Sequence, residues 1–415
     1  MINKIAFRNF KIFKNWQTLE LKPITILIGK NNSGKSAVLK LMTLIEGALS
    51  SNEAKPVNLV NDGVEIGKKF NDLIYGKFSR ELGIKLFQEN LEPKENEALS
   101  VEIAVDTKKY TPYIDYWKHN NEPALRFLSN DTYENDNHEE FLCKFAGLNL
   151  LSHSVNKNKS GTNSTETFTV DTDSITNFTE TFSLNTDFIC SLRAQTKPYY
   201  SIENVRTKKS GMDGIHLYNF LIEDFLSTEK KYFNQIADWV KEKFEGWELY
   251  VDVDSEPYPI ELRKGKLNIN LTETGMGIGQ VLPLIIRAIK PCIEETLIII
   301  EEPESHLHSY AHAQLAQLFA DSIKEDDNKK YLIETHSQNF ILRLRRLIAE
   351  GELKLSDLGI YYVDFDEDKN ESVLKEIKVD DGGGVEWWPT GIFSETSIET
   401  RAIYNAQLND LKNVD

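Results

Sequence analysis

The chain has 415 residues, of which 40% are hydrophobic and 27% charged, enough for one large or two medium domains. Its net charge of −17 argues against a protein that coats nucleic acid with its whole surface, but leaves room for a local basic patch. No apolar stretch approaches the roughly 18 residues of a membrane span, and the cysteines lack metal-ligand spacing. We expect a cytoplasmic protein that makes no membrane contact.

The first 50 residues predict strands followed by a phosphate-binding loop. Apolar and polar residues alternate over 2–10, as in a half-buried strand, and the run 24–28 is typical of a buried strand. A helix is expected to begin near Ala37. Between them stands a complete G-x-x-x-x-G-K-[ST] motif, Gly29, Lys30, Asn31, Asn32, Ser33, Gly34, Lys35 and Ser36.

This strand–loop–helix order predicts nucleoside triphosphate binding by the loop and by Ala37 at the helix start. Backbone N–H groups of the loop and the helix N-terminus favour bound phosphate. Lys35 is expected to reach the β- and γ-phosphates, and the Ser36 hydroxyl to ligate Mg²⁺.

The middle of the chain is harder to interpret. Strands are expected near 82–87 and 99–105, helices over 214–244, and strands again over 248–270. Residues 106–185 show no clear pattern. Their Ser/Thr/Asn-rich part, 152–185, is either a flexible insertion or a set of polar β-hairpins, and we favour hairpins.

Acidic side chains follow the next apolar strand, 297–300. Glu301 and Glu302 emerge at its carboxyl end, where ligand sites of open α/β sheets lie. Glu301 is expected to hold the Mg²⁺ shell, and Glu302 to orient and deprotonate the attacking water. A further buried strand, 331–333, leads to His336, which we expect to sense the γ-phosphate.

Upstream of the acidic strand, three glycines lie within five residues. Gly275, Gly277 and Gly279, followed by Gln280, let the backbone approach a ligand closely at the start of a predicted helix. Their position before the acidic strand makes them candidates for nucleotide binding.

Together these motifs resemble the ATP-binding cassette (ABC) class of ATPases, in the branch of RecF, SMC-like and overcoming-lysogenization-defect (OLD) proteins. The resemblance covers about 1–80 and 186–400. It rests on the opening strand 5–13, Walker A 29–36, the signature 275–283, the E-E-P-E-x-x-L-H segment 301–308, the switch segment 334–337 with its T-H-S and a tail, 381–393, similar to a W-P-x-G-F-F element. Gly279 replaces the usual signature serine, and Glu301 the usual Walker B aspartate.

The resemblance implies an α/β fold of the ABC-type P-loop NTPase kind, with a mixed sheet and an inserted β/α lobe. Its ATPase core would comprise 1–56 and 261–360, its lobe 57–260, and a C-terminal hairpin and tail 361–415. The implied cofactors are ATP and Mg²⁺. Two copies would form an ATP sandwich, in which the phosphate loop of one faces the signature of the other.

The resemblance also implies a regulatory or sensor ATPase for a separate effector protein, a nuclease or another enzyme, in bacterial anti-phage defence. One alternative is a DNA-repair or chromosome-maintenance ATPase that clamps DNA, with basic contacts from Arg343, Arg345 and Arg346 or from Arg206, Lys208 and Lys209. Another is a self-contained Mg²⁺-dependent nuclease using Asp364 and Asp366, although that segment reads more simply as a hairpin turn.

Overall fold

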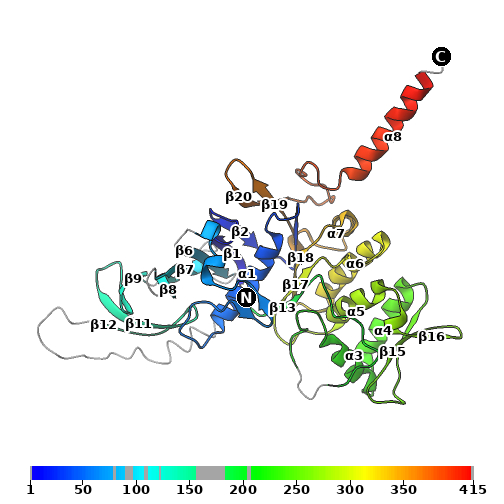
Figure 1. The fold of residues 1–415 in the computed structure, drawn as a ribbon, viewed down its shortest axis with the longest axis horizontal. Helices are drawn as coiled ribbons and strands as arrows, with labels where there is room; N and C mark the ends of the chain where they lie inside the picture. The colour runs from blue at the N-terminus through cyan, green and yellow to red at the C-terminus, as the bar shows by residue number, and fades with distance from the viewer. Residues whose placement is uncertain are drawn as a thin grey trace, which may run out of the picture.

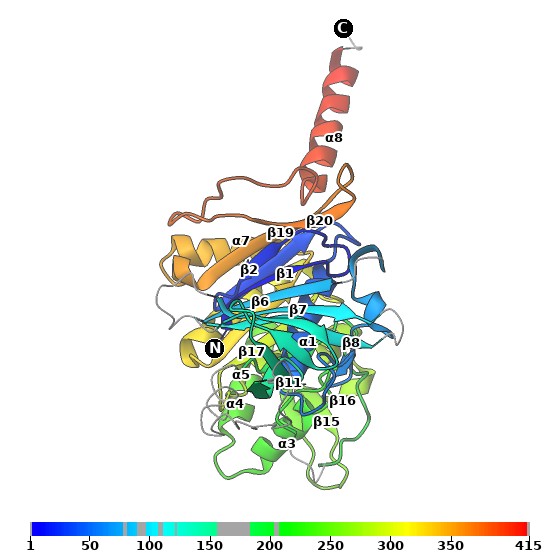
Figure 2. The same ribbon diagram turned by 90° about the vertical axis from the view of Figure 1, so that its left-hand side faces the viewer.

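Two large β-sheets pack on opposite sides of helix α1 (Lys35–Leu49), as Figures 1 and 2 show. The computed structural model describes residues 2–77, 81–88, 97–106, 111–120, 123–155, 183–202 and 207–412. Apolar side chains of α1 share one core with both sheets. The helix that begins at the phosphate loop is therefore held on both sides.

The first sheet has six strands in the order β13-β17-β18-β3-β19-β20. Neighbours from β13 to β19 are parallel, and β20 is antiparallel to β19. The carboxyl ends of β17, β18 and β3 consequently meet at one edge, where α/β proteins bind ligands. The strand bounds are β13 (Thr186–Ile189), β17 (Thr296–Glu301), β18 (Lys329–Glu334), β3 (Ile24–Gly29), β19 (Leu358–Asp366) and β20 (Glu371–Glu376).

The second sheet has nine strands in the order β12-β11-β10-β9-β8-β7-β6-β1-β2. It confirms the strands expected near 82–87 and 99–105 and shows that part of 106–185 is also β-structure. The hairpins expected over 152–185 fall mainly on 156–182, outside the described residues. The bounds are β1 (Ile2–Arg8), β2 (Gln17–Glu20), β6 (Glu81–Gln88), β7 (Glu97–Val105), β8 (Pro112–His119), β9 (Leu125–Ser129), β10 (Thr132–Glu134), β11 (Glu140–Ala146) and β12 (Asn149–Val155).

Helices cover the other face of the six-stranded sheet and share a second apolar core with it. The helical pattern expected over 214–244 is confirmed as two helices, separated near Lys230, whose φ is 49°. The helices are α3 (Leu217–Leu226), α4 (Lys231–Lys243), α5 (Met276–Ile289), α6 (Ser309–Glu325) and α7 (Gln338–Ala349).

Smaller elements complete the chain. A three-stranded sheet accompanies α4, and a short hairpin follows α1. Helix α8 (Glu395–Lys412) extends away from the body in both views (Figures 1 and 2). The remaining strands are β14 (Glu248–Val251), β15 (Ile260–Lys264), β16 (Leu267–Asn270), β4 (Val60–Asn61) and β5 (Val64–Glu65).

The mixed α/β fold with a phosphate loop is thus confirmed. The hairpin expected around Asp366–Asn370 is also confirmed, because β20 returns antiparallel to β19. Strand β13 lies within the range predicted for the inserted lobe, yet it is an edge strand of the six-stranded sheet. None of the described helices combines the length and apolar character that crossing a membrane requires.

Candidate functional site

The phosphate loop runs from the end of β3 to the start of α1. Gly34, at the N-cap of α1, has a φ of 103°, and a Cβ there would lie 2.9 Å from the Ile12 side chain. Only glycine fits this backbone without strain. Lys30, Asn31 and Asn32 are exposed on the loop, whereas the Ser33 side chain is buried.

Lys35 lies at the centre of the loop, with a relative exposure of 3%. Its Nζ donates to the carbonyl oxygens of Gly29 and Lys30, at 3.1 and 2.9 Å, and lies 3.6 Å from a carboxylate oxygen of Glu334. Burial lowers the pKa of Lys35, and the Glu334 charge opposes this shift. The predicted phosphate-binding cation is therefore held within the loop that should cradle the phosphates.

Glu334, at the end of β18, is a site residue that the sequence analysis did not assign. It accepts a hydrogen bond of 2.8 Å from the Ser36 hydroxyl, the predicted Mg²⁺ ligand. The signal that could have identified it is positional. It ends a buried strand parallel to β3, so its carboxylate emerges at the same sheet edge as the loop.

Glu302 follows β17 and adopts a left-handed backbone with a φ of 41°, a conformation that costs energy and is frequent at functional sites. Its carboxylate accepts 2.8 Å from the Ser305 hydroxyl, and its N–H donates to the Glu334 carbonyl. One ligand atom each from Glu302, Glu334 and His336 lie within 4.8 Å of one another, an arrangement that could hold a metal ion.

Glu301 points elsewhere, because its carboxylate accepts from the Ser191 backbone N–H at 3.4 Å. Burial and the nearby Glu334 charge raise the pKa of Glu301. Within the described residues it is not part of the three-residue metal-capable group. The Mg²⁺ role of Glu301 and the general-base role of Glu302 remain predictions.

His336, the third member of this group, lies at the molecular surface. Its backbone N–H donates to the buried Glu304 carboxylate, which fixes the turn after β18. Partial burial of the ring, together with the Lys35 charge, lowers the pKa of His336. The imidazole is therefore neutral at physiological pH and can donate one hydrogen bond to a γ-phosphate oxygen.

The glycine cluster forms the start of α5. Gly275 is exposed at the N-cap and Gly277 is half-buried, whereas Gly279 is buried. A Cβ at Gly279 would lie 2.6 Å from the Thr196 methyl group. A serine at this position, which the family resemblance leads one to expect, would therefore require the Thr196 side chain to move.

Gln280 is directed into its own chain, where its side-chain amide is paired with the backbone of Arg193 at 3.3 and 3.4 Å. The Arg193 guanidinium in turn donates 2.8 Å hydrogen bonds to the carbonyls of Glu301 and Glu302. Burial lowers the pKa of Arg193 to about 10. Arg193, which the sequence analysis did not assign, thus ties the start of α5 to the acidic strand end.

A cavity of about 420 Å³ opens beside the loop. Residues 29–31 form one wall, Thr335 and His336 a second, and residues 391–393 of the C-terminal tail a third. The participation of the tail was not predicted.

The residues behind the alternative hypotheses have other partners. Asp364 pairs with Lys375 at 2.8 Å and Asp366 with Lys369 at 3.1 Å, both within the β19–β20 hairpin region. The arginines of α7 are bonded to a glutamine, a backbone carbonyl and a glutamate. Lys208 and Lys209 also pair with carboxylates, and Arg206 lies outside the described residues.

A phosphate loop between a buried parallel strand and a helix, with carboxylates at the same sheet edge, defines a P-loop nucleoside triphosphatase. The chain belongs to the AAA ATPase domain family AAA_15, whose model matches residues 1–341. It is accordingly an ATPase. A search among curated proteins gives no significant match.

Comparison with solved structures finds SMC head domains at low similarity. One is an SMC head bound to the C-winged helix domain of ScpA, with a TM-score of 0.43 and 13% identity, covering 91% of this chain and 98% of that one. The SMC head domain from Thermotoga maritima has a TM-score of 0.38 and 14% identity, covering 91% and 99%. A head with an extended coiled coil, bound to a ScpA C-terminal domain derived from Pyrococcus furiosus, has a TM-score of 0.41 and 11% identity, covering 91% and 96%.

Proposed function

We propose that this ATPase binds ATP with Mg²⁺ between two copies of the chain, hydrolyses it slowly, and thereby regulates a separate effector protein. The proposal that the chain binds ATP with Mg²⁺ rests on one observation. Lys35 and Ser36 of the loop both lie against Glu334, which belongs to the cluster formed with Glu302 and His336. Such a cluster fits a divalent cation beside a triphosphate.

Each group of residues at the site has its own role. The loop and the α1 N-terminus bind the phosphates, and Ser36 with Glu334 or Glu301 holds the metal shell. Glu302 orients the attacking water and accepts its proton, while neutral His336 donates to the γ-phosphate. Mg²⁺ would supply charge neutralisation at the β- and γ-oxygens.

The second copy would complete the site with its signature segment. Gly275, the N-cap of α5, is exposed, so a partner's helix start is available to the γ-phosphate side. Because Gly279 and Gln280 face their own chain, we expect the contact to use backbone N–H groups of 275–277. Without a signature serine hydroxyl, hydrolysis should be slow.

The effector and a role in bacterial anti-phage defence rest on the family resemblance alone. Protection of cells against phage by the gene with its genomic neighbours, lost in Lys35→Ala, would support that role. The DNA-clamp alternative is less favoured because Lys208 and Lys209 form ion pairs within the chain. The nuclease alternative is less favoured because Asp364 and Asp366 do so too.

The decisive experiment is the Glu302→Gln variant. We expect its turnover to fall about 100-fold, the usual contribution of a general base, and the protein to accumulate as an ATP-bound dimer in light-scattering measurements. Lys35→Ala should stay monomeric with ATP. Glu367→Gln, in the exposed turn after β19, is the matched control and should behave as wild type. Unchanged turnover in Glu302→Gln would overturn the assignment of the base, and a monomeric Glu302→Gln with ATP bound would overturn the sandwich.

A further inference from the structure

The C-terminal tail between β20 and α8 is fastened to the ATPase core along its length. The Trp387 indole N–H donates to the Glu376 carbonyl at 3.0 Å, and Arg345 of α7 donates to the Gly383 carbonyl at 2.7 Å. Figure 2 shows this extended segment running from β20 to the base of α8. Its path is therefore set by the core and not by α8.

These attachments bring the tip of the tail to the nucleotide site. Trp388 donates from its indole nitrogen to the Ile392 carbonyl at 3.1 Å, and its ring lies 6.1 Å from that of Phe393. Phe393 has a φ of 58°, a strained conformation for an aromatic residue. The Trp388 contacts hold residues 391–393 as a tight turn.

The turn forms the one mainly apolar wall of the 420 Å³ cavity. The opposite walls carry polar groups, namely the exposed loop residues Lys30 and Asn31 and the imidazole of His336. Ile392 and Phe393 are half-buried there. An apolar cover over a charged phosphate site excludes water and strengthens every electrostatic contact beneath it.

We propose that residues 391–393 are a nucleotide-contacting lid, supplied by the same chain, that borders the γ-phosphate side of the site next to His336. This inference rests on the proposed function, because it requires that ATP occupies the loop. The lid borders His336 and not the far side of the loop, so it should favour ATP over ADP. Occupancy and lid closure are then reciprocally linked, since each stabilises the other.

The first test is the affinity of Phe393→Ala for ATP and for ADP, measured by calorimetry in the presence of Mg²⁺. We expect ATP affinity to fall about tenfold, a usual loss for truncating one well-packed contact side chain, and ADP affinity to change less than about threefold. Phe365→Ala is the matched control, because Phe365 is 40% exposed on β19 and does not line the cavity. Equal losses for both nucleotides, or no loss, would overturn the lid.

A second measurement needs no variant. Hydrogen exchange of the wild-type chain should show that a non-hydrolysable ATP analogue slows exchange in the peptide that contains 391–393, and that ADP does so less. If wild-type protein binds no ATP, the proposed function fails. If it binds ATP but the tail peptide exchanges equally with and without the analogue, the lid alone is wrong.

Discussion

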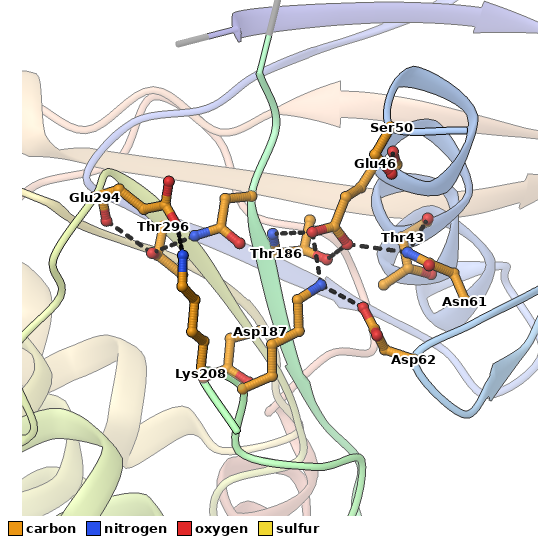
Figure 3. A network of polar contacts seen from close by, with 12 residues as sticks. Thr43, Glu46, Ser50, Asn61, Asp62, Thr186, Asp187, Lys208, Glu294 and Thr296 are labelled. Carbon is orange, nitrogen blue, oxygen red and sulfur yellow. Dashed lines mark hydrogen bonds and ion pairs between the residues drawn. The ribbon is translucent and has the colours of Figure 1, made fainter. Parts of the chain in front are cut away.

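The six-stranded sheet has an amino edge, where its parallel strands begin, and a carboxyl edge, where they end. The two differ in how their buried charges are compensated. At the amino edge, where β13 and β17 begin, the buried carboxylates Asp187 and Glu46 each have a cation, and Figure 3 shows the polar network around Glu46. Asp187, only 3% exposed, accepts from Arg287 Nε at 2.5 Å and from the Ser210 N–H and hydroxyl. Glu46 of α1 accepts from Lys209 at 2.6 Å and from the backbone N–H and hydroxyl of Thr186.

At the carboxyl edge the balance is reversed. Four glutamates, Glu301, Glu302, Glu304 and Glu334, lie here with two buried cations, Lys35 and Arg193. Burial raises the pKa of Glu304 as well as that of Glu301. Within the described part of the chain, carboxylates here outnumber these cations, an excess that suits the binding of a divalent cation.

Paired buried charges hold this fold together, whereas an excess of like charge marks where a ligand belongs. A buried ion pair that loses one member is left with an uncompensated charge, which is costly. A buried carboxylate that lies among other carboxylates is destabilised by repulsion and burial, so removing its charge removes that cost. Substitutions at the amino edge should therefore lower the free energy of unfolding, whereas substitutions at the carboxyl edge should mainly affect ligand binding.

The largest effect is expected at the amino edge, for Asp187→Asn. Burial alone would raise the pKa of Asp187, but the Arg287 charge together with the hydrogen bonds from Ser210 and Arg287 outweighs it and lowers that pKa. Removing the carboxylate strands the Arg287 guanidinium, which is 4% exposed. We expect the free energy of unfolding, measured in urea, to fall by about 3–5 kcal/mol, while ATP affinity at temperatures where the protein is folded stays unchanged.

The control for that variant is Asp321→Asn, which removes an exposed partner of Lys324 on α6. It should cost less than about 0.5 kcal/mol, because exposed ion pairs contribute little. If Asp187→Asn lowered the free energy of unfolding no more than Asp321→Asn, the ion pairs at the amino edge would not stabilise the fold.

The next effect is expected at the carboxyl edge, for Glu334→Gln. Glutamine still accepts from Ser36, and Lys35, unlike Arg287, keeps two carbonyl partners and a second nearby carboxylate, Glu302, so stability should change by less than about 1 kcal/mol. Loss of the charge should weaken Mg²⁺-dependent ATP binding at least about tenfold, because a carboxylate is a far better magnesium partner than an amide. Titration of a fluorescent ATP analogue at several Mg²⁺ concentrations measures this. A large loss of stability with unchanged Mg²⁺ dependence would reverse the roles of the two edges.

The sequence predicted the carboxyl edge better than the amino edge, for a physical reason. The phosphate loop, the acidic strand end and His336 each lie within a contiguous motif whose chemistry fixes its place on a sheet. Strand period and apolar runs were enough to identify β3, β17 and β18. The parallel order of those strands then brought the motifs together.

What could not be predicted depends on contacts between distant segments. Arg287 and Asp187 are 100 residues apart, and no local pattern pairs them. Gln280 lies in the segment that resembles the ABC signature, but only the packed structure shows that its side chain faces Arg193. The tail reaches the phosphate loop through attachments to α7 and β20 that no periodicity in the sequence encodes.

The smallest effect is expected for Glu304→Gln, and its sign is opposite to that of Asp187→Asn. Because burial raises the folded-state pKa of Glu304, the native protein binds more protons than the unfolded chain between pH 4.5 and that raised value. Its contribution to stability is therefore present at low pH and lost as pH rises through the folded pKa. At pH 7 the ionised group is unfavourable, so a neutral glutamine, whose oxygen still accepts from the His336 N–H, should raise the free energy of unfolding by about 0.5–1 kcal/mol. Urea unfolding at pH 5 and pH 7 should show this gain at pH 7 and a smaller one at pH 5. A loss at pH 7 would mean that the Glu304 charge, like that of Asp187, is compensated in the fold.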